Sequence, residues 1–495
     1  MKLADILHET RVNAVRGPVD RLIHALRYDS RRVETNDVFF AWKGVKTDGH
    51  RYIAEVCDRG AAAVVLENPQ FGGVGPTFIE VDDARRAMAT MSASFFGRPD
   101  RALRMVGVTG TNGKTTTTFV LKHLLAEPDA PVGLIGTVRY EIGARVLPAA
   151  RTTPESLDLH ELLAQMKAAG CRSAVMEVSS HALEQGRVAP IDFQVGIFTN
   201  LTQDHLDYHG TMENYFEAKR LLFANLDRAQ NAGVAVINLD DSYGAKLARS
   251  LPQRVRAITY SVRGAGGAEI TASDLRVNAS GSRGTLHIDG AKYDFELPLI
   301  GSYNVANALA AVGGALALGV APGTIIERLR DTPQVPGRLE KFVSGDDVLA
   351  VVDYAHTDDA VRKALTVLRG ITSGRLLVVL GCGGNRDAAK RPLMARAAVE
   401  TADFAIFTAD NPRNERIESI LEQMVAGVSE SHWAEKFQTE PDRRQAIAHA
   451  LALAKPGDVV CIAGKGHETT QEIAGQYHPF DDRIVVQEFL RRRAA

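Results

Sequence analysis

A glycine-rich loop between a buried strand and a helix constrains the fold of this chain more than any other sequence feature. The apolar run Met105–Thr109 predicts the strand. The helix is indicated by four apolar residues that recur on one of its faces: Val120, Leu121, Leu124 and Leu125. The loop between them reads Gly110, Thr111, Asn112, Gly113, Lys114, Thr115 and Thr116. Glycines let backbone N–H groups turn inward toward an anion, and the helix N-terminus adds positive potential. The segment therefore predicts a phosphate-binding loop in an α/β sheet.

Two side chains of the loop have the chemistry for a nucleoside triphosphate. Lys114 is placed to reach the β- and γ-phosphates, and the Thr115 hydroxyl to coordinate Mg²⁺. The spacing departs from the common Walker pattern, whose first glycine would fall on Val108. The alternative is a tight strand-to-helix turn with an incidental lysine and threonine. The strand before the loop and the helix after it favour the phosphate site.

Length and the order of apolar runs predict three α/β domains. At about 150 residues per domain, 495 residues correspond to roughly three. We expect a small first domain over residues 1–103, a central P-loop-type domain with a mostly parallel sheet over 104–333, and a Rossmann-like α/β domain over 334–495. The strands on which this rests are Ala61–Leu66, Thr77–Val81, Ser173–Val178, Val195–Phe198, Val234–Asn238, Val348–Val352, Leu376–Leu380, Phe404–Thr408 and Val459–Ala463.

Composition and charge exclude several classes of protein. Lys and Arg number 58 against 60 Asp and Glu, so a nucleic-acid or anionic-membrane surface is not expected as the main partner. The apolar stretch Ala308–Val320 is shorter than the ~20 residues of a membrane span and predicts a buried helix. The N-terminal MKLADILHET carries acidic residues and predicts no signal peptide. The four cysteines lie far apart, which indicates buried reduced thiols. We expect a cytoplasmic monomer.

A second group of polar residues follows the predicted central strands. Glu177 ends the apolar run 173–178, at the sheet edge where ligands bind in parallel α/β folds. Asp204, His205, Asp207 and His209 lie within six residues and invite a metal site. Zinc would favour more His or Cys ligands, so Mg²⁺ beside the phosphate loop suits this region better. The alternative is a polar helix start capped by Asp204. The pattern around Lys219 alone predicts a solvated lysine.

Taken together, these motifs resemble the ATP-dependent muramyl ligases, and most closely the members that add the third residue of the peptidoglycan stem peptide. The resemblance runs from about residue 28 to residue 483. It is carried by segments 110–116 (GTNGKTT), 176–188 (MEVSSHALEQGRV), 199–210 (TNLTQDHLDYHG), 303–307 (YNVAN), 337–340 (GRLE), 353–357 (DYAHT), 381–387 (GCGGNRD), 410–413 (DNPR) and 464–468 (GKGHE). Folylpolyglutamate synthases share the phosphate loop but are less expected to carry segments 176–188 and 410–413.

The resemblance implies an amide ligase. ATP would phosphorylate the D-glutamate γ-carboxylate of UDP-N-acetylmuramoyl-L-alanyl-D-glutamate. The amine of meso-2,6-diaminopimelate would then attack the acyl phosphate, in peptidoglycan precursor synthesis. A phosphate-loop NTPase acting as a switch or motor is a rival of another class. The second α/β block, with its own Gly-rich turns, argues against it.

The resemblance also implies roles for individual residues. Nucleotide contacts would come from the phosphate loop and from Asn304, Asn307, Arg338, Asp353 and His356. The sugar nucleotide and its peptide would contact Ser30, Val45, Lys46, Thr47, Arg151, Thr152, Thr153, Ser179, Gln185 and Arg187. Arg151 stands where many relatives have asparagine. Thr115, Glu177, His205 and Lys219, the last carbamylated to N6-carboxylysine, would surround Mg²⁺. With Lys114, the last three would form the catalytic group.

The third substrate is indicated by Asp410, Asn411, Pro412 and Arg413. Read alone, these residues predict a surface turn, because Asn-Pro is a strong turn former. The resemblance implies instead a site for meso-diaminopimelate, completed by Arg386, Gly464 and Glu468. The physics agrees, since diaminopimelate differs from lysine by a carboxylate that a guanidinium binds bidentately. Glu468 would take the distal ammonium.

Overall fold

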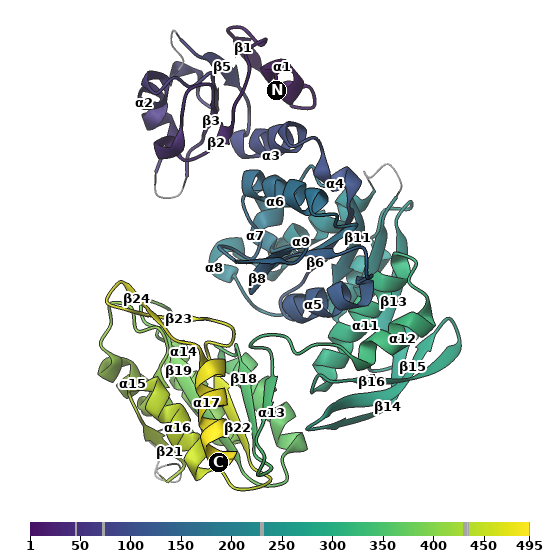
Figure 1. Ribbon diagram of the computed structural model, residues 1–495, viewed down its shortest axis with the longest axis vertical. Helices are drawn as coiled ribbons and strands as arrows, with labels where there is room; N and C mark the ends of the chain where they lie inside the picture. Colours follow the sequence, from purple (N-terminus) through teal and green to yellow (C-terminus); the bar gives the residue numbers. More distant parts are fainter. Residues whose placement is uncertain (45–46, 72–74, 228–231, 429–432, 434, 495) are drawn as a thin grey trace. The chain divides into compact units, whose positions relative to one another are not determined.

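The chain forms two compact units in the computed structural model, which describes residues 1–44, 47–71, 75–227, 232–428, 433 and 435–494 (Figure 1). The first unit comprises Met1–Thr271 and Asn307–Ile325. The second comprises Ala272–Ala306 and Ile326–Ala495. Each unit is built around strands of mostly parallel sheet. None of the helices in the described part of the chain is both long and apolar enough to span a membrane.

The first unit opens with a small five-stranded sheet in the order β1-β5-β4-β3-β2. Strands β2 to β5 are parallel and β1 pairs antiparallel with β5. The runs at residues 61–66 and 77–81 were predicted as strands, and the structure confirms both. The elements are α1 (Leu3–Leu7), β1 (Ala14–Arg16), β2 (Leu26–Arg27), η1 (Ser30–Arg32), β3 (Val38–Ala41), η2 (Gly49–Tyr52), α2 (Ile53–Asp58), β4 (Ala63–Leu66), η3 (Pro69–Phe71), β5 (Thr77–Glu80), α3 (Ala84–Phe95) and α4 (Pro99–Ala102).

An eleven-stranded sheet follows in the order β16-β15-β14-β13-β12-β11-β6-β10-β7-β8-β9. Its central strand β6 is parallel to β10 and β11 on either side, so the segments that follow all three strands meet at one edge. The elements are β6 (Arg104–Thr109), α5 (Lys114–Leu125), β7 (Val132–Ile135), β8 (Arg139–Ile142), β9 (Arg145–Pro148), α6 (Ser156–Ala168), β10 (Ser173–Glu177), α7 (Ser180–Glu184), β11 (Phe193–Phe198), α8 (Leu206–His209), α9 (Met212–Leu226), β12 (Val234–Asn238), α10 (Ser242–Arg249), β13 (Arg256–Ser261), β14 (Ile270–Asn278), β15 (Gly281–Ile288), β16 (Ala291–Leu297), α11 (Ser302–Ala317) and α12 (Pro322–Arg330).

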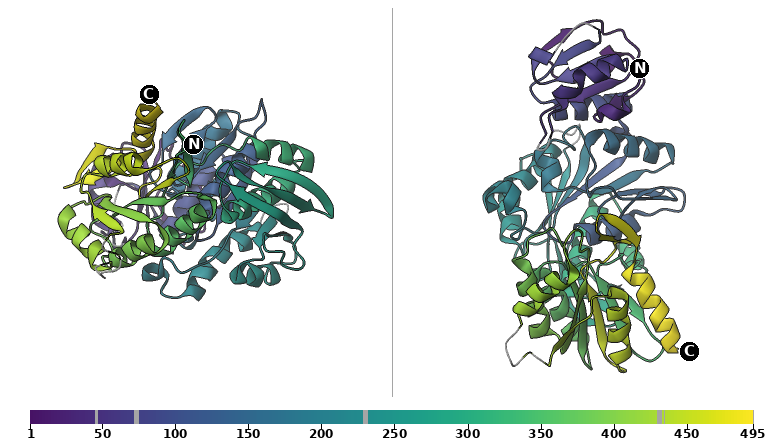
Figure 2. Two further views of the ribbon diagram at one scale, coloured as in Figure 1. Left: turned by 90° about the horizontal axis from the view of Figure 1, so that it is seen from below. Right: turned by 90° about the vertical axis from the view of Figure 1, so that its left-hand side faces the viewer.

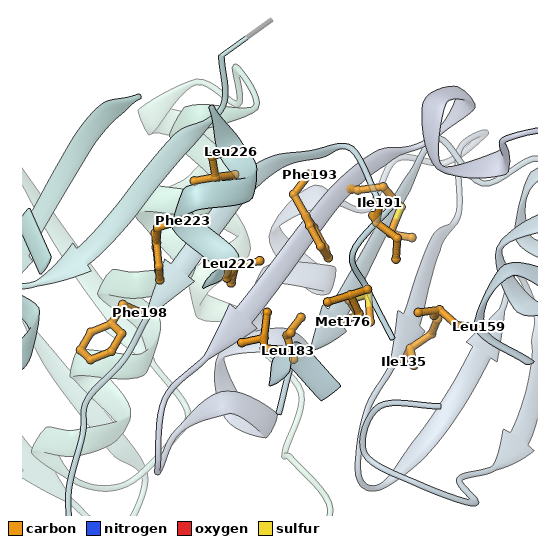
Figure 3. Packing of buried hydrophobic residues seen from close by; sticks show 14 of the residues in the cluster. Ile135, Leu159, Met176, Leu183, Ile191, Phe193, Phe198, Leu222, Phe223 and Leu226 are labelled. Carbon is orange, nitrogen blue, oxygen red and sulfur yellow. The ribbon is translucent and has the colours of Figure 1, made fainter. Parts of the chain in front are cut away.

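Apolar side chains on one face of this sheet pack against α9. Figure 3 shows part of that core, with Met176 and Phe193 from the strands and Leu222 and Phe223 from the helix. Burial of such side chains stabilises the sheet by about 1.5–3 kcal/mol each. The predicted buried helix over residues 308–320 is confirmed as the larger part of α11, and the predicted one-sided helix α5 is in fact buried along most of its length.

The second unit holds a six-stranded sheet in the order β17-β18-β22-β19-β20-β21. Strands β18, β22, β19, β20 and β21 run parallel to one another. Strand β17 pairs antiparallel with β18 at one edge of the sheet. The elements are β17 (Glu340–Val343), β18 (Leu349–Asp353), α13 (Asp358–Ile371), β19 (Leu376–Cys382), α14 (Lys390–Thr401), β20 (Phe404–Ala409), α15 (Ile417–Ala426), β21 (Phe437–Thr439), α16 (Arg443–Leu453), β22 (Val459–Ala463), β23 (Thr470–Ile473), β24 (Gln476–Pro479) and α17 (Asp482–Ala494).

Both faces of this second sheet are covered by helices (Figures 1 and 2). Alternate strand residues such as Leu376 and Val378 pack with α13, α14 and α15. The intervening residues, such as Leu377 and Val379, pack with α16 and α17. Burial on both faces explains why these strands read as continuous apolar runs rather than as alternating patterns.

Candidate active site

The glycine-rich loop 110–116 is held at the carboxyl end of β6 by close backbone packing. Gly110 has φ +149°, and a Cβ there would lie 1.9 Å from Thr199 Oγ1. Gly113 has φ +87° and precedes α5 as its N-cap, where a Cβ would lie 2.2 Å from Asn307 Oδ1. Thr111 N donates to Asn200 O at 2.8 Å. Both glycines are therefore required, and the predicted strand, loop and helix are confirmed.

We expect Gly110→Ala to weaken nucleotide binding. The added methyl group meets Thr199 at a backbone angle that L-residues rarely adopt, so the loop must shift at a cost of about 1–3 kcal/mol. Steady-state kinetics should give a KM for ATP raised at least about tenfold. Gly170→Ala is the matched control, since Gly170 has φ +80° but open space around its Cβ. An unchanged KM for ATP in Gly110→Ala would contradict this account of the loop.

Thr115 and Glu177 lie in contact at the same edge. The parallel register pairs Glu177 with Val108, two residues before the loop. Thr115 Oγ1 donates to Glu177 Oε1 at 3.0 Å, and both side chains are buried. The predicted position of Glu177 at the end of a central strand is confirmed. The two oxygen donors predicted for a metal are thus brought together.

Thr137 is a partner of Glu177 that was not predicted from the sequence. Thr137 N donates to Glu177 Oε1 at 2.8 Å, and Thr137 Oγ1 donates to Oε2 at 3.1 Å. A Cβ at Gly136 would lie 2.5 Å from the same carboxylate. The signal was available, since Gly136 and Thr137 follow the apolar run that forms β7.

Lys219 is the clearest departure from its local sequence pattern. The local pattern alone predicts a solvated lysine, but the exposed fraction of Lys219 is 1%. Its Nζ donates to Gly110 O at 2.9 Å and lies 4.5 Å above the ring of Tyr215. Lys114 Nζ donates to the same carbonyl oxygen, also at 2.9 Å. Burial and the charge of Lys114 lower the pKa of Lys219 well below its ordinary value.

The residues 204–209 are arranged differently from the predicted metal cluster. His209 is buried, and its ring nitrogens meet Ser180 Oγ at 2.9 Å and Glu184 Oε2 at 3.2 Å. His205 stacks edge-on to His181 and Tyr215, and burial lowers its pKa. In the described part of the chain no three His, Cys, Asp or Glu side chains form a group that could hold a metal ion. By themselves, the side chains of residues 204–209 do not form such a group, and the role of His205 beside Mg²⁺ stays a prediction.

A hydrogen-bonded network leads from Glu177 to the predicted peptide contacts. Thr152 Oγ1 lies 3.0 Å from Thr137 Oγ1, and Thr153 Oγ1 donates to Glu177 O at 2.8 Å. Ser179 N donates to Thr153 Oγ1, and Ser179 Oγ caps α7 by accepting from Ala182 N. The predicted residues Thr152, Thr153 and Ser179 are thus neighbours of the phosphate loop.

Arg187 is fixed at the far end of this network. Its guanidinium donates to Thr153 O at 2.9 Å and to Gln185 Oε1 at 2.7 Å, and pairs with Glu155 at 3.0 Å. Arg151, the position that departs from the family pattern, forms an ion pair with the same Glu155. The carboxylate of Glu155 is therefore shared by two arginines, which holds both in place.

Arg85, in helix α3, contacts this network. Its guanidinium donates to Gln185 Oε1 at 2.8 Å and lies 5.2 Å from the ring centroid of Trp42. Ser30 is buried in η1, and Thr47 is exposed, with its Oγ1 3.4 Å from Tyr52 Oη. The predicted contacts Val45 and Lys46 lie outside the described residues. Arg85 and Trp42 were not predicted, because nothing in their local sequence distinguishes them.

The remaining predicted nucleotide contacts fall in both units. Asn307 lies beside Gly113 in the first unit. Asn304, in the second unit, is buried and donates to Ile300 O at 2.8 Å. Asp353 ends β18 and accepts from Leu339 N at 2.7 Å, while Arg338 lies 4.9 Å from the ring centroid of Tyr354. His356 is exposed, with Nδ1 2.8 Å from Tyr354 O.

Segments 383–386, 410–413 and 464–468 follow parallel strands of the second unit and meet at one edge. The register pairs Cys382 with Ala409, and Leu380 with Ala463. Arg413 Nη1 donates to Gly384 O at 2.6 Å, and a Cβ at Gly464 would lie 3.5 Å from Asp410 Oδ2. Arg386 lies exposed in the first of these loops. Residues 410–413 are therefore not an isolated surface turn. The parallel sheet brings them together with the other predicted amino-acid contacts.

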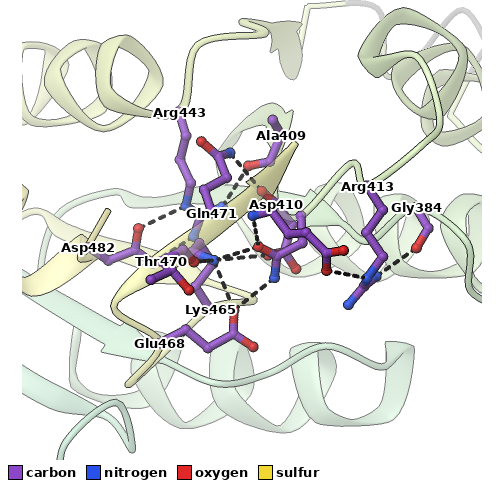
Figure 4. A network of polar contacts seen from close by, with 12 residues as sticks. Gly384, Ala409, Asp410, Arg413, Arg443, Lys465, Glu468, Thr470, Gln471 and Asp482 are labelled. Atoms are coloured by element: carbon purple, nitrogen blue, oxygen red, sulfur yellow. Dashed lines mark hydrogen bonds and ion pairs between the residues drawn. The ribbon is translucent and has the colours of Figure 1, made fainter. Parts of the chain in front are cut away.

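Arg413 is oriented by a carboxylate that the sequence did not reveal. Its Nε donates to Glu472 Oε2 at 3.1 Å, and its backbone pairs with the β23 strand through Glu472 O and Ala474 N. These contacts and Gly384 fix one side of the guanidinium (Figure 4). Among the described residues, its Nη2 has no hydrogen-bond partner.

Comparison with known proteins agrees with this arrangement. Sequence profiles described as the Mur ligase family catalytic domain, the Mur ligase middle domain and the Mur ligase glutamate ligase domain match residues 22–96, 108–315 and 337–466. The chain is 46% identical over 474 residues to the UDP-N-acetylmuramoyl-L-alanyl-D-glutamate–2,6-diaminopimelate ligase of Geobacillus kaustophilus, covering 95% of each chain.

Two further relatives carry the same name. The protein of Geobacter metallireducens is 42% identical, with 99% of this chain and 98% of that protein covered. A solved structure of such a ligase is 34% identical, has a TM-score of 0.73, and is matched over 100% of this chain and 99% of its own. The matches cover the phosphate loop, the Glu177 network and the Arg413 loop alike. On this evidence the chain belongs to the Mur ligase family, whose members are ATP-dependent ligases that form amide bonds.

Proposed function

We propose that this chain joins meso-2,6-diaminopimelate to the D-glutamate γ-carboxylate of UDP-N-acetylmuramoyl-L-alanyl-D-glutamate, using ATP. The observation that carries the proposal is the 46% identity, over 95% of the chain, to a protein named for this reaction. Residues 1–103, 104–333 and 334–495 would serve the sugar nucleotide, the ATP and the amino acid. The cationic groups Lys114, Arg187 and Arg413 match the phosphate and carboxylate groups that the three substrates carry.

The chemistry requires an activated carboxyl group. A carboxylate resists attack by an amine, and transfer of the γ-phosphoryl group to its oxygen supplies phosphate as a leaving group. Lys114 would leave its contacts with Gly110 O and Thr111 O, both 2.9 Å, to neutralise the transferring phosphoryl group. The amine of the amino acid then displaces phosphate as the new C–N bond forms and the amine loses its proton.

The donor set at Thr115 and Glu177 fits Mg²⁺. One hydroxyl and one carboxylate oxygen lie 3.0 Å apart at this position. Proteins usually bind Mg²⁺ through one or two such oxygen ligands, and substrate phosphate oxygens and water supply the remaining ligands. When bound, the ion would neutralise phosphate charge. We assign Thr115 and Glu177 as its holders, with His205 and carbamylated Lys219 as the further predicted members of the group.

The lowered pKa of Lys219 supports the carbamate. Only a neutral amine reacts with CO₂, and burial beside Lys114 favours that form. Carbamylation replaces a buried cation with an oxygen anion. This change would remove the repulsion between two ammonium groups that converge on Gly110 O.

Phosphate release tests the proposed reaction directly. We expect release only when ATP, the UDP-sugar dipeptide and meso-diaminopimelate are all present. Replacing the sugar dipeptide by a folate should abolish it, which separates this reaction from that of folylpolyglutamate synthases. Steady ATP hydrolysis with both acceptors omitted would refute the ligase assignment and favour a phosphate-loop switch or motor.

A further inference from the structure

Lys465 is a fully buried lysine at the predicted amino-acid site that the proposed mechanism does not use. Its exposed fraction is 0%. Its Nζ donates to Glu468 Oε2 at 2.9 Å, to Asn411 Oδ1 at 3.1 Å and to Thr470 O at 2.8 Å. Figure 4 shows this ammonium at the centre of the polar network. An ammonium has three N–H donors, so these contacts use all of them.

A lysine with no donor left cannot itself bind a substrate carboxylate. It acts instead on the groups that surround it. Two of those groups, Asn411 and Glu468, are among the predicted diaminopimelate contacts. We propose that Lys465 is the positioning residue that presents Asn411 and Glu468 to the amino-acid substrate, an inference that rests on the proposed function.

The orientation of the Asn411 amide follows from Lys465. Asn411 Oδ1 accepts from Lys465 Nζ and from Glu472 N, the latter at 3.0 Å. Two donors on Oδ1 direct the Nδ2 group the other way, where it donates to Glu468 Oε2 at 2.8 Å. Without the ammonium, Oδ1 keeps only the Glu472 N–H donor, so the amide loses one of the two contacts that set its orientation.

Glu468 is held by one oxygen only. Its Oε2 accepts from both Lys465 and Asn411. The structure gives Oε1 no hydrogen-bond partner among the described residues. The carboxylate is therefore fixed with one oxygen left for an ammonium, which is the group predicted to bind there.

Lys465 also controls the charge of Glu468. Burial favours the protonated carboxyl group, but Lys465, its hydrogen bond, Asn411 and His467 outweigh burial and lower the pKa of Glu468. Asp410, whose Oδ1 lies 3.6 Å from Lys465 Nζ, faces the same cluster; burial raises its pKa, against the effects of Lys465 and Arg443. Tyr354, Arg386, Arg443 and Asp482 are further charged or titratable groups that interact with this cluster. Removal of Lys465 should therefore raise the pKa of Glu468, because burial favours the protonated carboxyl group.

Kinetics of Lys465→Met should reveal a defect confined to one substrate. We expect the KM for meso-diaminopimelate to rise at least tenfold, with the KM for ATP and for the UDP-sugar dipeptide within twofold of wild type. The rise in this KM should grow as pH falls. Without Lys465 the pKa of Glu468 should be higher than in the wild-type protein, so a smaller fraction of its carboxyl group is ionised at low pH. Lys363→Met, a half-exposed surface lysine of α13 paired with Asp359, is the control expected to change none of these values.

A double-mutant comparison separates positioning from general damage. When Lys465→Met is added to Glu468→Gln, the KM for the amino acid should rise less than threefold further. The reason is that Lys465 is proposed to act through Glu468, which the first substitution has already changed. Lys465→Gln keeps a donor without the charge, and serves if the methionine variant does not fold; the same pH-dependent rise is expected. Equal rises in all three KM values, or additive effects with Glu468→Gln, would overturn the inference. Failure of the wild-type protein to use diaminopimelate would instead overturn the proposed function.

Discussion

Lys219→Ala should lose nearly all ligase activity and regain part of it with added short carboxylic acids. The alanine variant lacks the buried amine that would carry the carbamate, so kcat should fall by about 10²–10³-fold, the typical loss when one charge-stabilising group is removed. Acetate or formate can supply an oxygen anion to the vacated space. Steady-state phosphate release with increasing acid concentration measures this rescue.

Two controls define the Lys219 result. Lys246→Ala removes a half-exposed lysine of α10 that pairs with Glu213, and should leave kcat unchanged. Lys219→Met fills the buried space without an anion-binding cavity, and should be inactive without rescue. Near-normal activity of Lys219→Ala would rule out the carbamate role, and rescue by alkylamines rather than acids would show that a cation is needed there.

Arg413→Ala should abolish the preference for meso-diaminopimelate over L-lysine. The guanidinium, oriented by Glu472 and Gly384, is the predicted partner of the carboxylate that lysine lacks. Loss of one partner of a desolvated charge pair costs about 2–5 kcal/mol, so kcat/KM for diaminopimelate should fall by about 10²-fold or more. Arg413→Lys should restore little, because a lysine cannot form the bidentate pair.

The neighbouring Arg416 supplies a matched control for Arg413. Arg416 pairs with Glu418 on the surface, with 84% of its side chain exposed. Arg416→Ala should leave the ratio of kcat/KM values for the two amino acids unchanged. Equal turnover of both by the wild-type protein, or an unchanged ratio in Arg413→Ala, would show that another group selects the substrate.

Local sequence was sufficient for the elements that carry the site. Strands β6, β10, β19, β20 and β22 were predicted because burial on both faces leaves continuous apolar runs in the sequence. The glycines of the phosphate loop were predicted from their place between a strand and a helix. Since carboxyl ends of parallel strands share one edge, the approximate neighbourhood of Thr115 and Glu177 followed as well.

The partners that fix each functional side chain were not visible in the sequence. Thr137 lies 40 residues from Glu177 along the chain, and Glu472 lies 59 from Arg413, so neither pair has a local spacing signal. The sequence groups His209 with possible metal ligands because its neighbours along the chain are polar, whereas in the folded chain its ring contacts Ser180 and Glu184. Hydrogen bonds between distant segments depend on register and packing.

The sequence by itself determined the phosphate loop, the parallel α/β architecture and the candidate residues of the site. Tertiary structure alone decided which of the charged residues are buried. Lys219 and Lys465 occupy unremarkable positions in their local sequence, yet both lie at 1% exposure or less. The physical reason is that desolvation arises where segments meet only in the folded chain. Desolvation lowers the pKa of Lys219, and the buried Lys465 lowers the pKa of Glu468 through a contact that only the folded chain makes.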